Sequence, residues 1–151
     1  MTCEIRPTAP DDPVAMALIA ELNQALDDPR QPPASRHGYS VARLVAERVA
    51  FFVAWCDGAA AGCAGLAHAA GYGEVKRMYV RPTFRRRGVA QALLAELATQ
   101  ARAARLAYLR LETGIWQHDA IALYERAGFT RTGPFGPYRE DPFSVYFGRA
   151  L

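Results

Sequence analysis

The stretch VRPTFRRRGVA, residues 80 to 90, decides the fold, because it joins a predicted strand over 74–80 to a long helical pattern. The first N–H groups of a helix are unpaired and lie at the positive end of its dipole, so they bind phosphate oxygens. Gly88 lets the backbone approach such a ligand closely, and Pro82 shapes a tight entry from the strand. The stretch therefore predicts a site for a phosphorylated ligand.

The composition fits one compact domain spanning residues 1–151. About half of the residues (51%) are hydrophobic, and a chain of this length buries a substantial core. No apolar run approaches the roughly 20 residues that cross a bilayer, and the N-terminus lacks the apolar core of a signal peptide. We therefore expect a soluble, cytoplasmic protein.

The basic residues are unevenly distributed along the chain. The formal net charge of +3 is mild, but basic side chains are crowded into one stretch around the predicted site. Local charge, rather than net charge, predicts an anionic partner. The crowded residues are Lys76, Arg77, Arg81, Arg85, Arg86 and Arg87.

The cysteines and histidines show neither a metal-site pattern nor a disulfide framework. The cysteines are odd in number, and their spacing fits neither zinc ligation nor paired bridges, so we expect ordinary thiols. Each histidine is isolated, so no metal site is predicted. The residues concerned are Cys3, Cys56, Cys63, His37, His68 and His118.

Hydrophobic periodicity and turn residues predict a mixed succession of strands and helices. The predicted strands cover 3–6, 49–56, 61–69, 74–80, 106–112, 129–131 and 144–147. The predicted helices run from about 13 to 27, from 41 to 47 behind the capping residue Ser40, from 89 to beyond 101, and from 119 to 127. Two loops rich in proline and glycine, 28–38 and 133–142, are positioned to cover a ligand or to set specificity.

Two familiar phosphate motifs do not fit the turn at residues 80–90. A P-loop requires Gly-Lys followed by Ser or Thr, and no such lysine follows Gly88. The dinucleotide fingerprint requires three glycines, and this turn has one. The stretch therefore has a different pattern, in which a strand is followed by a proline, a basic turn and a helix.

The same stretch resembles the acyl-CoA site of the GNAT superfamily of N-acetyltransferases, whose pattern is V-x-P-x-x-[QR]-x-x-G-x-[GA]. A second stretch, AIALYERAGF at 120–129, resembles the next conserved region of that family, A-I-x-L-Y-x-x-x-G-F. The resemblance implies an α/β (α+β) fold. It implies a mixed, mostly antiparallel central sheet of about six to seven strands, with about four helices packed on both faces.

The resemblance also implies a set of residues that bind acetyl-CoA. Backbone amides from residue 86 to residue 91 would hold the pyrophosphate, and a bulge would expose the end of the 74–80 strand to the pantetheine arm. Gln117 occupies a place where relatives often carry asparagine, so its reach differs. The implied binding residues are Met78, Tyr79, Val80, Arg85, Arg86, Arg87, Gly88, Val89, Ala90, Gln91, Gln117 and Tyr124.

Two glutamates are candidates for the base that removes a proton from the acceptor amine, which is mostly protonated at neutral pH. Glu74 resembles the catalytic glutamate of family members that acetylate lysine, and it alternates onto one face with Lys76, Met78 and Val80. Glu112 resembles the proton acceptor of some protein N-terminal acetyltransferases. Either carboxylate can instead be a plain ion pair with Lys76 or Arg110.

Tyr124 resembles the general acid of the family, which protonates the departing thiolate. The alternative is a half-buried aromatic residue with a packing role. His118 is placed to shuttle protons, or to be a solvated helix start. Trp116 and Tyr72 can wall a substrate pocket or simply pack in the core.

The leading hypothesis is an acetyl-CoA-dependent N-acetyltransferase that passes acetyl directly to a primary amine of a small molecule or peptide, without a metal. A non-catalytic acyl-CoA-binding module would keep the phosphate site and leave the acid and base idle. A nucleic-acid binder using Arg81 to Arg87 is less favoured, because the basic patch is short and lacks a docking motif. Members of the resembled family are often homodimers.

Overall fold

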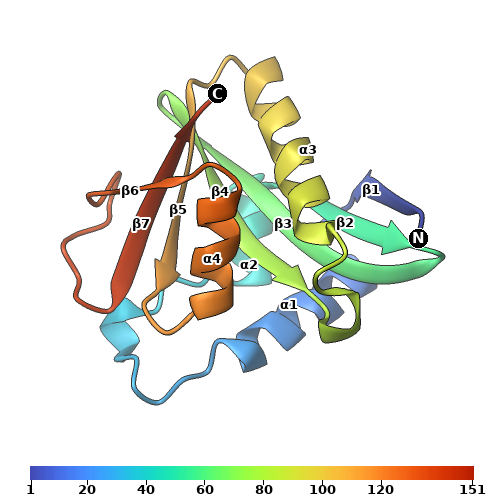
Figure 1. The fold of residues 1–151 in the computed structure, drawn as a ribbon, viewed down its shortest axis with the longest axis horizontal. Helices are drawn as coiled ribbons and strands as arrows, with labels where there is room; N and C mark the ends of the chain where they lie inside the picture. The colour runs from blue at the N-terminus through green and yellow to red at the C-terminus, as the bar shows by residue number, and fades with distance from the viewer.

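The computed structural model describes all of residues 1–151 and contains one mixed sheet of seven strands (Figure 1). The strand order across the sheet is β1-β2-β3-β4-β5-β7-β6, and β4–β5 is its one parallel pair. The strands are β1 (Cys3–Pro7), β2 (Ala50–Cys56), β3 (Ala59–Ala69), β4 (Tyr72–Val80), β5 (Tyr108–Gly114), β6 (Thr130–Thr132) and β7 (Ser144–Ala150). The predicted fold class is therefore confirmed.

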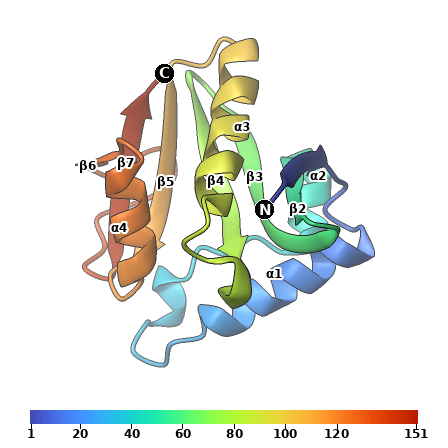
Figure 2. The ribbon, with the colours of Figure 1, turned by 45° about the vertical axis from the view of Figure 1, so that its right-hand side comes forward.

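Four α-helices cover the two faces of the sheet: α1 (Pro13–Ala25), α2 (Val41–Ala46), α3 (Val89–Ala103) and α4 (His118–Arg126). One hydrophobic cluster packs the sheet against α3 and α4. A second, smaller cluster packs the opposite face against α1 and α2. Figure 2 shows α3 and α4 on the near side, with α1 below the sheet.

The helices begin where local chemistry favours a start. The side chain of Asp12 accepts a hydrogen bond from the N–H of Val14 ahead of a first-turn proline, and Ser40 Oγ accepts from the N–H of Arg43. The buried stripe of α3, which includes Leu93 and Leu97, lies against the middle of the sheet. Burying each leucine of this kind stabilises the fold by about 2 kcal/mol.

The parallel strands β4 and β5 pair over a short length only. Their register joins Tyr72 to Tyr108, Gly73 to Leu109 and Glu74 to Arg110, and no pairing continues beyond that point. In Figure 2 the two strands lie together at the upper end and separate towards the lower end. The sheet therefore opens beside the second half of β4.

A β-bulge in β4 sets which side chains face which layer. Cys63 pairs with Tyr79 and Gly65 with Lys76, so one extra residue of β4 lies between these pairs, and Arg77 has a φ of 54°. The extra residue inverts the alternation of side chains. Beyond the bulge Tyr79 joins the cluster under α1.

The bulge corrects the predicted face of β4. Glu74, Lys76, Met78 and Val80 were expected to share one face, but Met78 and Val80 pack against the α3 cluster together with Val75. Strict alternation fails because the inserted residue shifts the period of the strand by one.

The cysteine prediction was wrong for two of the three residues. Cys3 and Cys56 form a disulfide, with Cα atoms 4.0 Å apart, and Cys63 is a buried free thiol. Antiparallel pairing of β1 with β2 places Cys3 opposite Cys56 across a separation of 53 residues. Spacing along the chain does not reveal that contact.

Several predicted boundaries also moved. The strand predicted at 106–112 is β5, which begins at Tyr108 and ends at Gly114, and the last strand continues to Ala150. The 28–38 loop contains a short 3₁₀ turn, Pro33–Ser35, and a second one at Pro82–Phe84 connects β4 to α3. None of the helices combines the length and hydropathy that a bilayer crossing requires.

The bulge predicts a strict requirement for glycine at position 62. A Cβ added there would lie 2.4 Å from the carbonyl oxygen of Tyr79 and 3.2 Å from the Cα of Val80, and both are backbone atoms. We expect Gly62→Ala to lower the free energy of unfolding by about 2 kcal/mol, measured by urea denaturation. Gly133→Ala is the control, because its added Cβ meets no heavy atom within 4 Å. Equal stability of the two variants would contradict the packing described for β3 and β4.

Candidate active site

A continuous pocket of about 1220 Å³ occupies the opening beside the second half of β4. One end is lined by the turn before α3 and by its first residues, and the middle by β5 and α4. The other end is lined by the end of α1, the 28–38 loop and Tyr138. The pocket therefore connects the predicted anion site to a second end for which the sequence predicted no specific binding residues.

The α3 end of the pocket carries a run of free backbone donors. The N–H groups of residues 86 to 91 donate to no carbonyl, and no side chain caps the helix. Gly88 is the N-cap with a φ of 83°, and Arg86 also has a positive φ, of 61°. Arg85 Nε donates to the carbonyl oxygen of Val80 over 3.0 Å, which fixes the turn against β4. The arrangement is suited to a polyanion.

Most of the predicted cofactor residues line this pocket. They are Met78, Tyr79, Val80, Arg85, Arg86, Gly88, Val89, Ala90, Gln91, Gln117 and Tyr124. Arg87 is the exception: it is exposed and does not line the pocket.

Tyr124 lies where the pocket passes α4. Its side chain is 5% exposed, and its ring contacts Phe129 edge-on with ring centroids 5.6 Å apart. Its hydroxyl forms no hydrogen bond within the protein, and burial raises the pKa of Tyr124 well above its ordinary value. The residue is a neutral phenol at every physiological pH.

Glu112 contributes a desolvated carboxyl from β5. Burial raises the pKa of Glu112 to about 7, although the hydrogen bond donated by Ser144 Oγ to Glu112 Oε2, 2.8 Å long, opposes the shift. Its other carboxyl oxygen has no partner in the protein, and the residue lines the pocket. A carboxyl with such a pKa exchanges protons readily near neutrality.

Glu74 is held in a closed cluster with Lys76 and Tyr138. Lys76 Nζ lies 2.8 Å from Glu74 Oε2 and donates to the Tyr138 hydroxyl over 2.9 Å, while that hydroxyl donates to Glu74. Lys76 also lies over the ring of Tyr39, 4.0 Å from its centroid. The ion-pair alternative therefore describes Glu74, which lines the pocket as part of a fixed network.

The residues at the end of the pocket beyond this cluster were not predicted as site residues from the sequence. Arg77, Asn23 and His37 line it together with Tyr138, and the rings of His37 and Tyr138 meet edge-on with centroids 5.0 Å apart. Loops 28–38 and 133–142 therefore touch above this end. Arg77 stood out in the sequence only as one member of the basic run.

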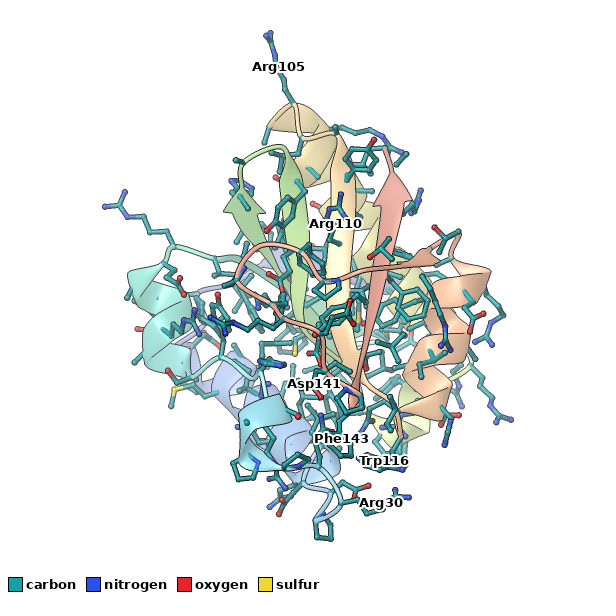
Figure 3. The ribbon with its side chains drawn as sticks, turned by 90° about the vertical axis from the view of Figure 1, so that its left-hand side faces the viewer. Arg30, Arg105, Arg110, Trp116, Asp141 and Phe143 are labelled. Atoms are coloured by element: carbon teal, nitrogen blue, oxygen red, sulfur yellow. A yellow bond between two sulfur atoms is a disulfide. The ribbon has the colours of Figure 1, made fainter.

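Three other candidates lie outside the pocket. Tyr72 packs edge-on against Phe135, with centroids 5.5 Å apart, and His118 does not line the cavity. Trp116 stacks on Phe143 at 5.6 Å, with the guanidinium of Arg30 4.6 Å from its ring centroid. Figure 3 shows this stack at the lower rim of the molecule. Tyr72 and Trp116 therefore pack against loop residues, and neither belongs to the two core clusters.

Comparison with known proteins gives a consistent family. A family model described as the acetyltransferase (GNAT) family matches residues 15–129. The chain is 41% identical over 145 residues to the IAA acetyltransferase of Azospirillum brasilense, covering 95% of this chain and 94% of that protein. It is 32% identical to the uncharacterised N-acetyltransferase YsnE of Bacillus subtilis, covering 93% and 97% of the two chains.

Solved structures with the same fold span the whole chain. One from Klebsiella pneumoniae, with a proposed identity as an acyl-CoA N-acyltransferase, has a TM-score of 0.81 and 36% identity, covering 99% of this chain and 98% of its own. PaiA N-acetyltransferase of Thermoplasma acidophilum, solved with coenzyme A, has a TM-score of 0.80 and 18% identity, with full coverage of both chains. The second likeness concerns the fold alone.

The raised pKa of Glu112 predicts a pH-dependent stability. The folded protein keeps the Glu112 proton up to a pH of about 7, whereas the unfolded chain releases it near the ordinary value of 4.5. The free energy of unfolding should therefore fall by about 3 kcal/mol as the pH rises through this window. Glu112→Gln should remove that fall and be more stable than the wild type at pH 8. Denaturation at pH 5 and pH 8 measures the free energy of unfolding of the wild type and of Glu112→Gln, with the exposed Glu125→Gln as control. If Glu112→Gln still lost stability between these two pH values as the wild type does, the raised pKa of Glu112 would be contradicted.

Proposed function

The chain belongs to the acetyltransferase (GNAT) family, and from that premise we propose that it transfers acetyl from acetyl-CoA directly to a primary amine of a small molecule or peptide. The observation that carries the proposal is the continuity of one pocket. It joins the free N–H groups at the start of α3 to the phenol of Tyr124 and the carboxyl of Glu112.

The residues of the α3 end fit the phosphates of acetyl-CoA. Free N–H groups of residues 86 to 91 and the side chains of Arg85 and Arg86 supply donors and positive charge. The edge of β4 that faces β5 is unpaired beyond Glu74, so Met78 and Val80 can present backbone groups to the pantetheine arm. Acetyl-CoA, when bound, supplies the activated acetyl thioester.

Two side chains of the middle of the pocket handle protons. Glu112 accepts a proton from the incoming ammonium, because a pKa near 7 leaves much of it ionised at neutral pH. Tyr124 holds the proton that the departing sulfur requires, since burial keeps its hydroxyl neutral. Glu74 positions Lys76 and Tyr138 instead of acting as the base.

The proposal is tested first by thiol release from acetyl-CoA across a panel of primary amines. IAA is tried separately as an acceptor, because a relative carries its name. Tyr124→Phe should lower kcat by about 100-fold, as loss of a general acid does, and leave acetyl-CoA affinity unchanged. Tyr108→Phe is the control, because Tyr108 is 45% exposed.

Each other outcome selects a different function. Tight acetyl-CoA binding without consumption of any amine would favour a non-catalytic acyl-CoA-binding module. Binding to nucleic acid that weakens steeply with salt, without binding to coenzyme A, would favour a phosphate-backbone binder.

The identity of the base is tested by the pH dependence of kcat at saturating substrates. The wild type should show activity that rises about tenfold per pH unit below pH 7 and then levels off. Glu112→Gln should lose this rise of kcat with pH, and Glu74→Gln should retain it. The opposite result for the two variants would make Glu74 the base.

A further inference from the structure

Arg77 is a buried guanidinium without an acidic partner. The residue is 8% exposed, its Nε is buried without any hydrogen-bond acceptor, and only Asn23 Oδ1 accepts from the group. No carboxylate lies within ion-pairing distance of it. Burial lowers the pKa of Arg77; the Cys63 thiol opposes that shift, and no carboxylate does. A buried, unpaired charge is strongly destabilising.

The other cations around this end of the pocket are all paired. Lys76 contacts Glu74 at 2.8 Å and Arg36 contacts Asp27 at 3.0 Å, and both cations line the pocket; outside it, Arg81 contacts Glu21 at 2.8 Å. The chain thus supplies a carboxylate to each of these cations and none to Arg77. The missing partner is not explained by a shortage of acidic residues nearby.

The backbone at Arg77 adds a second cost. Its φ of 54° is a left-handed conformation that favours glycine or asparagine, and it marks the bulge of β4. An arginine is not required to form a bulge. Strain and buried charge therefore coincide at one residue, which lines the pocket beside Asn23, His37 and Gly38.

We propose that the acceptor amine also carries a carboxylate, and that Arg77 binds this carboxylate at the end of the pocket opposite the start of α3. The inference rests on the proposed function, because it names the substrate class of the same pocket. A planar guanidinium with free N–H groups matches the two coplanar oxygens of a carboxylate. The remaining cations are neutralised by their own partners, so a ligand with one negative charge balances the charge of Arg77. A phosphate dianion would leave an excess negative charge.

The test compares acceptors that differ only in the carboxylate. The panel contains ω-amino acids from glycine to 6-aminohexanoate and common α-amino acids, each alongside its carboxamide. For the wild type we expect kcat/KM to be 10- to 100-fold higher for the preferred acid than for its carboxamide, as loss of a charged hydrogen bond implies. Arg77→Gln should bring this ratio close to 1 by raising KM for the acid, with KM for acetyl-CoA unchanged.

Two further variants separate binding from folding. Arg105→Gln is the matched control: Arg105 is also left-handed, with a φ of 59°, and it is exposed and extends away from the molecule in Figure 3. It should keep the wild-type ratio. Arg77→Lys retains the charge without the planar fork, so its ratio should lie between those of the wild type and Arg77→Gln.

The outcomes distinguish this inference from the proposed function. Turnover of amines with equal preference for acid and carboxamide would overturn the inference and leave the proposed function intact. Preference for O-phosphoethanolamine over β-alanine, lost in Arg77→Gln, would replace the carboxylate by a phosphate. If no amine is consumed, calorimetric titration of the CoA-saturated protein with the same acids decides the inference alone: binding lost in Arg77→Gln supports it, and absent or unchanged binding overturns it.

Discussion

The early end of pairing between β4 and β5 is the constraint on which the rest of the structure depends. After Glu74 and Arg110 the two strands part, and the pocket occupies the space that further pairing would close. The two helices that follow these strands bring their own ends to this opening. The start of α3 supplies free N–H groups at one side, and Tyr124 from α4 reaches the middle. A continuous sheet would leave no room for a ligand between these groups.

The bulge at Arg77 gives the opening two chemically different sides. It turns Met78 and Val80 towards the α3 layer, whereas Arg77 contacts Asn23 of α1 and Lys76 lies over the ring of Tyr39. The two glutamates that line the opening, Glu74 and Glu112, also differ in their surroundings. Glu74 is paired with Lys76, whereas Glu112 has no cation in contact and burial raises its pKa to about 7. Two glutamates that look equivalent in the sequence thus lie in different electrostatic surroundings.

Much of the fold follows from local signals in the sequence. The basic turn at 80–90 and the capping residue Ser40 act over a few residues, and the structure agrees with both. The order of elements around the cofactor motif could therefore be predicted before any contact was known.

What could not be predicted depends on distant contacts. Cys3 meets Cys56 only because β1 pairs with β2, and Tyr138 reaches Glu74 from a loop 64 residues away. The bulge depends on the register between β3 and β4, which the pattern of either strand alone does not encode. The isolated state of Arg77 is visible only once every neighbouring carboxylate has been placed.

The most direct test of the account is an amide NMR titration of the protein with coenzyme A. The account predicts that the N–H signals of residues 86 to 91 move downfield, since these free donors gain phosphate acceptors, with further shifts at Met78 and Val80. Shifts confined to other surfaces, or an unchanged spectrum at saturating coenzyme A, would contradict the claim that the opening beside β4 is the acyl-CoA site.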